Sequence, residues 1–319
     1  MNKIAQLILV ALIVMLALTV WRFMPERTGE CANPECRYDL NVLKKTDTNF
    51  LLQAQVHWVK PALTNLTALA ITPDDRIIVG ASRGIEMLFQ DGTRLSGFPV
   101  SGPVHCLAAA SDGGILVGFK DHIELYSGDG VRKAVWKSPD PKTVLTSLAA
   151  SSNVVYAADH VNRTVWRFSW SGEVLGRING KDGTPDKTGF VVPSAFFDVA
   201  VAADGSVWIA NPGMHRVEHY DAEGTYLSCW GVESMKPDGF CGCCNPSNIA
   251  LTPDGDFVTS EKHIVRVKRY DTDGRFSGII SGQEEWGKDA VGLDLAVDSK
   301  GRILVLDPSA DVVRIYTKR

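Results

Sequence analysis

The sequence predicts an all-β protein built from repeats of a four-stranded antiparallel unit, preceded by one membrane-spanning helix. The repeat is predicted by apolar strand-like segments that recur six times, and by the turn residues that follow them. The starts of successive segments lie 38, 41, 51, 50 and 46 residues apart. Repeats of this length are typical of propellers and solenoids, in which one unit cannot bury its apolar face alone.

Each repeat opens with a short apolar strand, which we expect to be the innermost strand of its sheet. The six strand cores are Leu69–Ile71, Leu107–Ala109, Leu148–Ala150, Val199–Val201, Ile249–Leu251 and Leu295–Val297. In four repeats a turn pair leads from this strand into a second one: Asp74-Asp75, Asp112-Gly113, Asp204-Gly205 and Asp254-Gly255. Asp-Gly pairs accept the positive φ angles of a two-residue hairpin, so these pairs predict tight antiparallel connections.

A second set of turns joins a third strand to a fourth in five of the repeats. These turns are Asp91-Gly92, Asp129-Gly130, Ser171-Gly172, Glu223-Gly224 and Asp273-Gly274. The sixth repeat has no such fourth strand after Val312–Tyr316. We therefore expect the β-like run Phe50–Val59 to pair with Val312–Tyr316 as the outer strand of the last sheet, which closes the ring and protects its edges.

Two segments carry a family resemblance. The stretch Asn245–Glu261 resembles an NHL repeat, and Phe197–Asp221 resembles another. The six units together cover roughly residues 50–319, and the resemblance implies a six-bladed β-propeller. It implies no particular activity, because propellers of this kind serve as lyases, hydrolases, sensor domains and scaffolds.

The N-terminal segment predicts a membrane location. Ile4–Trp21 is 18 residues long with no charged side chain, and about 17–25 apolar residues span a bilayer. We expect an uncleaved signal-anchor helix over residues 1–21, with a cleaved signal peptide as the alternative. Positive charges on both sides, Lys3 against Arg22 and Arg27, leave the orientation open, and we expect the propeller on the extracytoplasmic side of the cell membrane.

Residues 22–49 form the expected polar stalk between this anchor and the propeller. Cys31 and Cys36 lie in the stalk and are expected to form a local disulfide. The whole chain has 33 basic and 37 acidic residues, a net charge of −4, so it offers no basic stripe and no nucleic-acid partner is expected.

The residues just before the six inner-strand cores should converge on the mouth of a central channel. They are Ala68, Cys106, Ser147, Asp198, Asn248 and Asp294. Asp198, Asn248 and Asp294 would offer the oxygen ligands that calcium prefers, and lactonase-like propellers hold a catalytic calcium with Asp, Asn and Glu. The alternative is that these side chains hydrogen-bond to neighbouring blades or to channel water.

Three cysteines in four residues form a second candidate site, Cys241-Gly242-Cys243-Cys244. Adjacent cysteines are poor disulfide partners, because their Cα atoms are only about 3.8 Å apart. With Cys229 they make a group of four, which allows two disulfides, a zinc or iron–sulfur site with four thiolates, or a reactive redox pair. The seven histidines are scattered along the chain, which argues against a zinc site of three histidines in the channel.

These patterns lead to two functional expectations. The first is a membrane-anchored binding or assembly module with a protein partner in a membrane redox complex, which carries a cysteine-ligated metal or cluster. The alternative is a calcium-dependent, lactonase-like hydrolase that uses Asp198, Asn248 and Asp294. Bound calcium would distinguish the hydrolase from the binding module.

Overall fold

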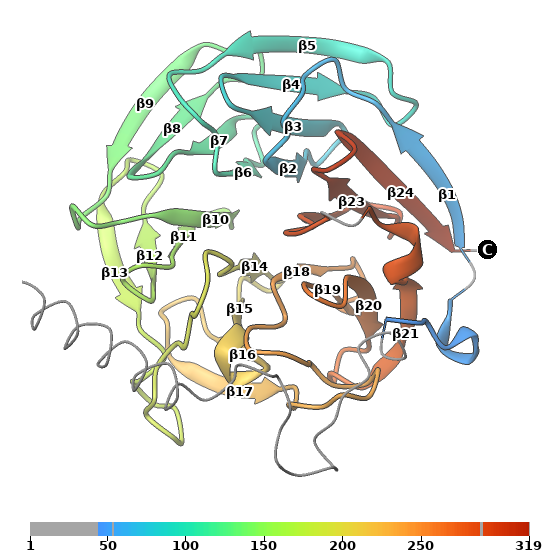
Figure 1. Cartoon of the computed structure of the whole chain (residues 1–319). Helices are drawn as coiled ribbons and strands as arrows, with labels where there is room; N and C mark the ends of the chain where they lie inside the picture. The colour runs from blue at the N-terminus through green and yellow to red at the C-terminus, as the bar shows by residue number, and fades with distance from the viewer. Residues whose placement is uncertain (1–43, 53, 288–289, 319) are drawn as a thin grey trace, which may run out of the picture. The chain divides into compact units, whose positions relative to one another are not determined.

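The computed structural model describes residues 44–52, 54–287 and 290–318. Within this range the chain forms six antiparallel sheets of four strands each, arranged around a common centre (Figure 1). The predicted six-bladed β-propeller is thus confirmed. We number the blades in the order of their inner strands along the chain.

The strand bounds follow the predicted repeat closely. Blade one is β2 (Ala68–Ile71), β3 (Ile77–Ala81), β4 (Gly84–Leu88) and β5 (Arg94–Pro99); blade two is β6 (Cys106–Ala109), β7 (Ile115–Gly118), β8 (His122–Tyr126) and β9 (Arg132–Lys137). Blade three is β10 (Leu145–Ala150), β11 (Val155–Asp159), β12 (Thr164–Phe168) and β13 (Val174–Ile178); blade four is β14 (Val199–Val201), β15 (Val207–Asn211), β16 (Arg216–Tyr220) and β17 (Tyr226–Trp230). Blade five is β18 (Asn248–Leu251), β19 (Phe257–Glu261), β20 (Arg266–Tyr270) and β21 (Phe276–Ser281); blade six is β22 (Leu295–Val297), β23 (Ile303–Asp307), β24 (Val312–Lys318) and β1 (Ala54–Val59).

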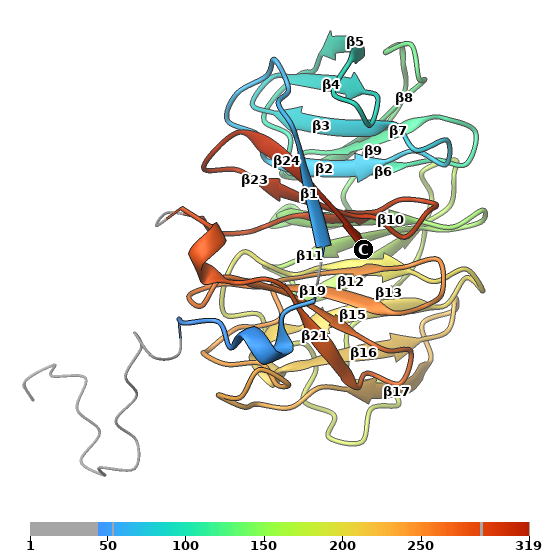
Figure 2. The same cartoon turned by 90° about the vertical axis from the view of Figure 1, so that its right-hand side faces the viewer.

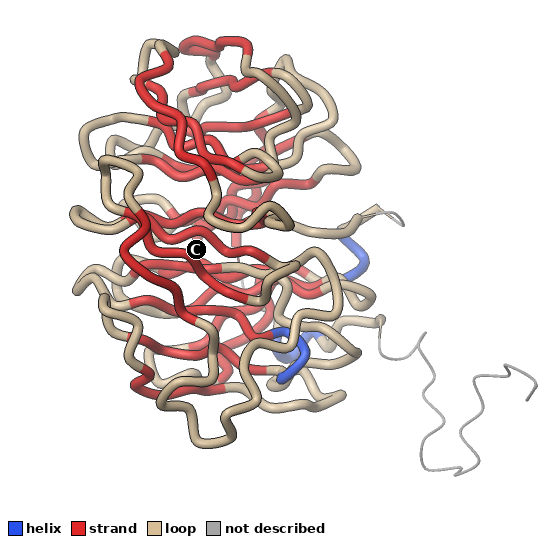
Figure 3. The backbone as a smooth tube through the Cα atoms, turned by 90° about the vertical axis from the view of Figure 1, so that its left-hand side faces the viewer, coloured by secondary structure: helices blue, strands red, loops and turns tan. Residues whose placement is uncertain are grey.

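The predicted turns connect these strands. Gly255 has φ of +87°, and its N–H donates to the carbonyl of Thr252 at 2.9 Å, which closes the hairpin between β18 and β19. Gly274 plays the same part between β20 and β21, with φ of +76° and a bond to Asp271 of 2.9 Å. Figure 3 shows the result for the described residues, which form strands and loops with only short helical turns.

The apolar core lies between neighbouring blades. Between blades one and six, for example, Leu69 and Val79 pack with Leu304, Leu306 and Val313, and all five side chains are buried. Each blade therefore needs the next one to cover its faces, as the repeat pattern predicts.

The closure of the ring is confirmed. β1 pairs with β24 in antiparallel register, with Val56 opposite Tyr316 and Val59 opposite Val313. Figures 1 and 2 show the two strands side by side although they come from opposite ends of the described chain. Val59 is 1% exposed and belongs to the core between blades one and six.

The closing strand is shorter than the predicted Phe50–Val59. Phe50 ends the 3₁₀ turn η2 (Thr48–Phe50), where the Asp47 side chain accepts the Asn49 N–H. Leu52 N–H then donates to Ile279 of β21 at 2.8 Å, so this part of the run lies against blade five. Its apolar side chains cover an outer strand, which explains why its composition resembles that of a strand.

Part of the expected stalk also contacts the propeller. Thr46 N–H donates to Glu284 Oε1 at 2.7 Å, and Glu284 lies in the short helical turn η4 (Gln283–Glu285). The expected anchor over residues 1–21 and the stalk cysteines Cys31 and Cys36 lie outside the described residues. Across the described ranges, no helix reaches the length and apolar character that a membrane crossing needs.

Candidate functional site

The acidic residues expected at the channel mouth tie neighbouring blades together. Asp198 immediately precedes β14 of blade four, and its Oδ2 accepts the Ile249 N–H of blade five at 2.6 Å. Asp294 does the same between blades six and one, where its Oδ2 accepts the Leu69 N–H at 2.7 Å. The second oxygen of each carboxylate accepts the N–H of the next residue, Val199 or Leu295, at 2.9 Å.

The other ring positions are also engaged within the protein. Ser147 Oγ accepts the Val199 N–H at 3.3 Å, and Asn248 Oδ1 accepts the Ser260 hydroxyl at 3.2 Å. Cys106 is buried, which raises the pKa of its thiol, and the nearby charges of Asp294 and Asp198 raise it further. These contacts support a structural role for the ring, one of the two interpretations that the sequence left open.

Burial sets the protonation of the two carboxyls. It raises the pKa of Asp198 from 3.8 to about 6, despite hydrogen bonds from Ser147 and backbone amides. Burial and then repulsion by Asp198 raise the pKa of Asp294 from 3.8 to about 7. The start of the inner strands therefore holds two carboxyl groups that favour the neutral form more than an exposed aspartate does.

The cysteine loop, residues 231–247, lies at the same end of the propeller. It leads directly into β18, whose first residue, Asn248, occupies the ring. The β18–β19 register pairs Asn248 with Ser260, so the loop that follows β19 reaches this end as well. The two loops that flank this hairpin of blade five are therefore neighbours in space.

A buried lysine of blade five holds the underside of the cysteine loop. Lys268 is fully buried, and its Nζ donates to the carbonyls of Gly239 at 2.7 Å and Pro237 at 3.1 Å. Its Nζ also lies 3.2 Å from Glu261 Oε1, and Arg266 Nε binds the other oxygen of Glu261 at 2.6 Å. Burial lowers the pKa of Lys268 to about 8, although Glu261 raises it.

Four polar contacts fix the loop where the cysteines lie. Asn245 Nδ2 donates to the carbonyl of Cys241 at 2.7 Å and to that of Lys262 at 3.1 Å, and its Oδ1 accepts the Lys262 N–H at 2.9 Å. His215 Nε2, from blade four, lies 2.5 Å from the Gly242 carbonyl oxygen. Gly242 has φ of +81°, a conformation that glycine adopts without strain. The loop is thus held from two blades.

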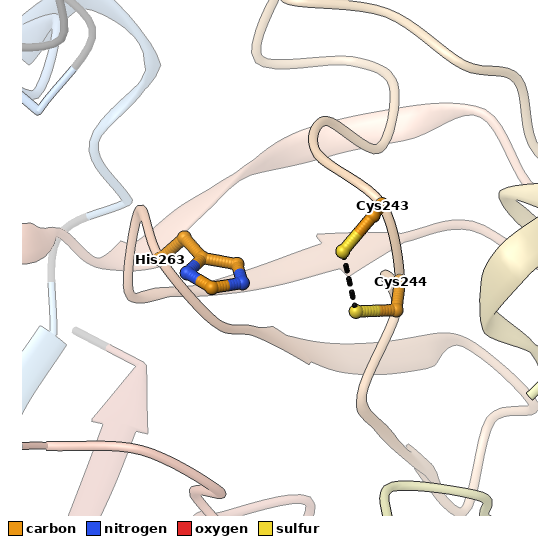
Figure 4. Close-up of side chains that lie close together, drawn as sticks. All are labelled: Cys243, Cys244 and His263. Atoms are coloured by element: carbon orange, nitrogen blue, oxygen red, sulfur yellow. Dashed lines mark hydrogen bonds between the residues drawn. The ribbon is translucent and has the colours of Figure 1, made fainter. Parts of the chain in front are cut away.

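The structure brings Cys243 and Cys244 together with His263. One ligand atom from each of the three lies within 4.8 Å of the others, and the two sulfurs are 3.0 Å apart. Figure 4 shows the imidazole of His263 facing the pair from the loop between β19 and β20. Cys244 is buried, whereas Cys243 and His263 are exposed, so the cluster is open on one side. Thiolates and imidazole are ligands for soft and borderline metals.

The two thiols of the cluster differ in acidity. Burial alone would raise the pKa of Cys244, but the Lys262 ammonium, the Cys243 thiol and the Ser194 hydroxyl lower it below that of an ordinary thiol. The pKa of Cys243 is raised, first by its hydrogen bond to Cys244 and then by burial. Cys244 is therefore the more readily ionised of the pair.

The other two cysteines of the predicted group of four lie outside this cluster. Cys241 is buried, and its sulfur accepts a long hydrogen bond of 3.7 Å from Arg266 Nη2. Cys229 is exposed on β17, opposite Glu218 of β16. All five cysteines in the described ranges are free thiols, so no disulfide forms among them.

The sequence does not predict His263 or Lys262 as site residues. The pairing of β18 with β19 is a signal that could have indicated this site. Asn248 pairs with Ser260; Cys244 lies four residues before Asn248, and His263 lies three residues after Ser260. The segments on either side of one hairpin therefore bring Cys244 and His263 together.

Comparison with known proteins supports the fold. No family model and no curated protein matches the chain. Among solved structures, virginiamycin B lyase from Staphylococcus aureus aligns with a TM-score of 0.59 and 13% identity, over 83% of this chain and 99% of the lyase. A streptogramin B lyase aligns with a TM-score of 0.57 and 12% identity, over 83% of this chain and 98% of that lyase. The WD40 propeller domain of Doa1 aligns with a TM-score of 0.56 and 16% identity, over 80% of this chain and 79% of that domain. At these identities the likeness shows the propeller fold alone.

Proposed function

We propose that this chain is an NHL-type propeller that acts as a binding module and holds one soft metal ion with Cys243, Cys244 and His263. The observation that carries the proposal is the convergence of two thiols and one imidazole within 4.8 Å. The loop that bears the thiols is held by Lys268, Asn245 and His215, so the donors are in place before an ion arrives. Preorganised donors bind an ion without an added cost of ordering the loop.

The donor set favours one ion over an iron–sulfur cluster. Clusters are held by four protein ligands, and neither Cys241 nor Cys229 belongs to the group of donors that lie within 4.8 Å of one another. A mononuclear site needs only these three residues and leaves one side open, because Cys243 and His263 are exposed. A ligand from solvent or from a partner protein could complete the coordination, as in open zinc sites.

The setting of the module is part of the same proposal. The apolar segment Ile4–Trp21 supports a membrane anchor, with the propeller on the extracytoplasmic side and a protein partner in a membrane complex. An ion held on an exposed propeller face would suit transfer or exchange with such a partner, because loops at this face are where propellers commonly bind.

The calcium-dependent hydrolase is the weaker proposal. All four carboxylate oxygens of Asp198 and Asp294 already accept backbone N–H groups. Calcium would have to share these oxygens with the bonds that join the blades.

Metal analysis of the full chain, purified without oxygen, tests the binding proposal. We expect about one soft ion per chain, lost in Cys243→Ser, Cys244→Ser and His263→Gln. Cys229→Ser serves as the matched control, because Cys229 is an exposed thiol outside the cluster. Unchanged circular dichroism would show that each variant is folded. Protein that neither contains nor takes up zinc, copper or iron would refute the proposal, and calcium lost on Asp294→Ala would favour the hydrolase.

A further inference from the structure

A pocket on blade three is lined by three basic side chains and by no acidic one. It has a volume of about 270 Å³, and Arg163, Arg177 and Lys181 form part of its wall. The other lining residues are Asn162, Thr164, Asn179, Thr188 and Phe190. We call it the blade-three pocket. It shares no residue with the proposed metal site, so it is a separate feature of the molecule.

Three segments of the chain bring the basic residues together. Arg163 directly precedes β12, Arg177 is the last residue but one of β13, and Lys181 lies in the loop that joins blades three and four. The Thr164 hydroxyl donates to the carbonyl of Ile178 at 2.8 Å. The end of β13 therefore lies beside the turn that carries Arg163, and Lys181 follows it by three residues.

The loop that closes the pocket is held in place by the protein itself. A Cβ on Gly180 would lie 2.9 Å from the Phe190 nitrogen, so the two ends of this loop segment approach as closely as glycine allows. The Phe190 side chain is buried in the core between blades three and four. Val191 N–H donates to Asn211 Oδ1 of blade four at 2.9 Å. The pocket is thus formed before a ligand arrives, which lowers the cost of binding one.

The three basic side chains have no partner of opposite charge among the described residues, where none of them donates a hydrogen bond or forms a salt bridge. The carboxylates that contact lining residues hold the amides instead. Asp159 accepts a hydrogen bond from Asn162 at 2.7 Å, and Asp182 accepts one from Asn179 at 3.0 Å. A concave site lined by charges of one sign attracts ions of the opposite sign and raises their local concentration.

The chemistry of the lining points to an oxyanion with more than one charge. A guanidinium offers a fork of N–H donors that matches phosphate or carboxylate oxygens, and a lysine ammonium adds a point charge. Three positive charges exceed the single charge of one carboxylate, whereas a phosphate group carries about −1.5 to −2 charges at pH 7. The volume of the pocket lies just below the roughly 300–1,000 Å³ of ordinary small-molecule sites, which favours a small ligand.

We propose that the blade-three pocket binds a phosphate group, as inorganic phosphate or as a small phosphate monoester. Arg163, Arg177 and Lys181 contact its oxygens. This site goes beyond the proposed metal binding and does not depend on it.

Calorimetric titration of the full chain with inorganic phosphate, at an ionic strength held constant with chloride, tests the proposal. We expect saturable binding of about one phosphate per chain, weakened at least about tenfold in Arg163→Gln and in Arg177→Gln, because each change removes a charged donor. Arg83→Gln is the matched control, since Arg83 is exposed in the corresponding turn between β3 and β4 of blade one. It should bind phosphate as tightly as the wild type, and so should Cys243→Ser.

Titration with glycerol 3-phosphate distinguishes the two sources of the phosphate group. Binding tighter than that of inorganic phosphate would indicate a monoester, equal or weaker binding would indicate phosphate itself, and both results support the site. Arg163 and Arg177 are exposed, so circular dichroism should show folded variants. A wild type that binds no phosphate at constant ionic strength, or arginine variants that bind it as tightly as the wild type, would overturn the proposal. Neither result would affect the proposed metal site.

Discussion

Asp294 of the last blade accepts a hydrogen bond from the Leu69 N–H of the first blade, with 2.7 Å between Oδ2 and N. The ring is therefore joined twice between its ends, at the inner strands by this bond and at the outer strands by the pairing of β1 with β24. One contact involves inner strands and the other an outer strand, so each can be tested alone.

Replacement of Asp294 by Ala should lower the free energy of unfolding by about 1–3 kcal/mol, because the Leu69 N–H would lose its partner in a buried place. Chemical denaturation followed by circular dichroism measures the change. Asp254→Ala is the matched control at an exposed turn, where we expect the free energy of unfolding to fall by less than about 0.5 kcal/mol. Equal effects of the two changes would contradict the interblade role.

The channel carboxyls should also make stability depend on pH. Their folded pKa values, about 6 for Asp198 and about 7 for Asp294, lie above the ordinary value of 3.8. The folded protein then binds more protons than the unfolded chain between about pH 4 and 7, so the contribution of these groups to stability falls as the pH rises through this window.

Denaturation at several pH values, compared with the variant Asp198→Asn/Asp294→Asn, isolates this effect. The wild type should gain stability relative to the double variant when the pH is lowered from about 7 to about 5. Parallel pH profiles for the two proteins would show that the carboxyls titrate normally.

The closing strand should be most sensitive at Val59, its one buried residue. Val59 is buried, whereas Val56 on the same strand is 43% exposed. Val59→Asp should destabilise the protein by at least about 2 kcal/mol, because it places a charge in the core between blades one and six. Val56→Asp should lower the free energy of unfolding by less than about 0.5 kcal/mol. Thermal unfolding of both variants measures the difference, and a mild effect of Val59→Asp would mean that β1 is not needed to close the ring.

Lys268 should control the order of the cysteine loop. Lys268→Met leaves the carbonyls of Gly239 and Pro237 without their donor and removes one partner of buried Glu261, which should cost about 3 kcal/mol or more. Limited proteolysis should then cut within residues 232–243, and metal affinity should fall. The exposed Lys236 gives the control variant Lys236→Met. Resistance of the Lys268→Met loop to protease, with full metal affinity, would contradict this role.

Much of the fold could be predicted because each blade carries local signals. Turn glycines such as Gly255 and Gly274 mark hairpins, and counting strands showed that one outer strand had to come from the N-terminal side. The start of that strand could not be predicted. An apolar residue such as Leu52 is equally suited to pairing in a sheet and to covering one, and here it covers blade five.

The candidate site could be predicted only in part. Cys243 and Cys244 stand out because they are adjacent, but His263 follows Cys244 by 19 residues and shares no ligand spacing with it. Cys244 and His263 lie close together because the loops before β18 and after β19 meet at one end of the propeller, and the register of this hairpin decides that. The contacts of the Lys262 side chain could not be predicted for the same reason, because Ser194 and Phe196 lie in a loop between two other blades.

The pairing of β1 with β24 has a consequence for how the protein is made. β1 leaves the ribosome first among the described strands, and its partner Val312–Lys318 leaves last. At about 5–20 residues per second, the wait lasts roughly ten to fifty seconds. During this time the core that buries Val59 has not formed and β1 has no strand to pair with. The exposed β1 segment of the nascent chain is therefore available to a chaperone for most of synthesis.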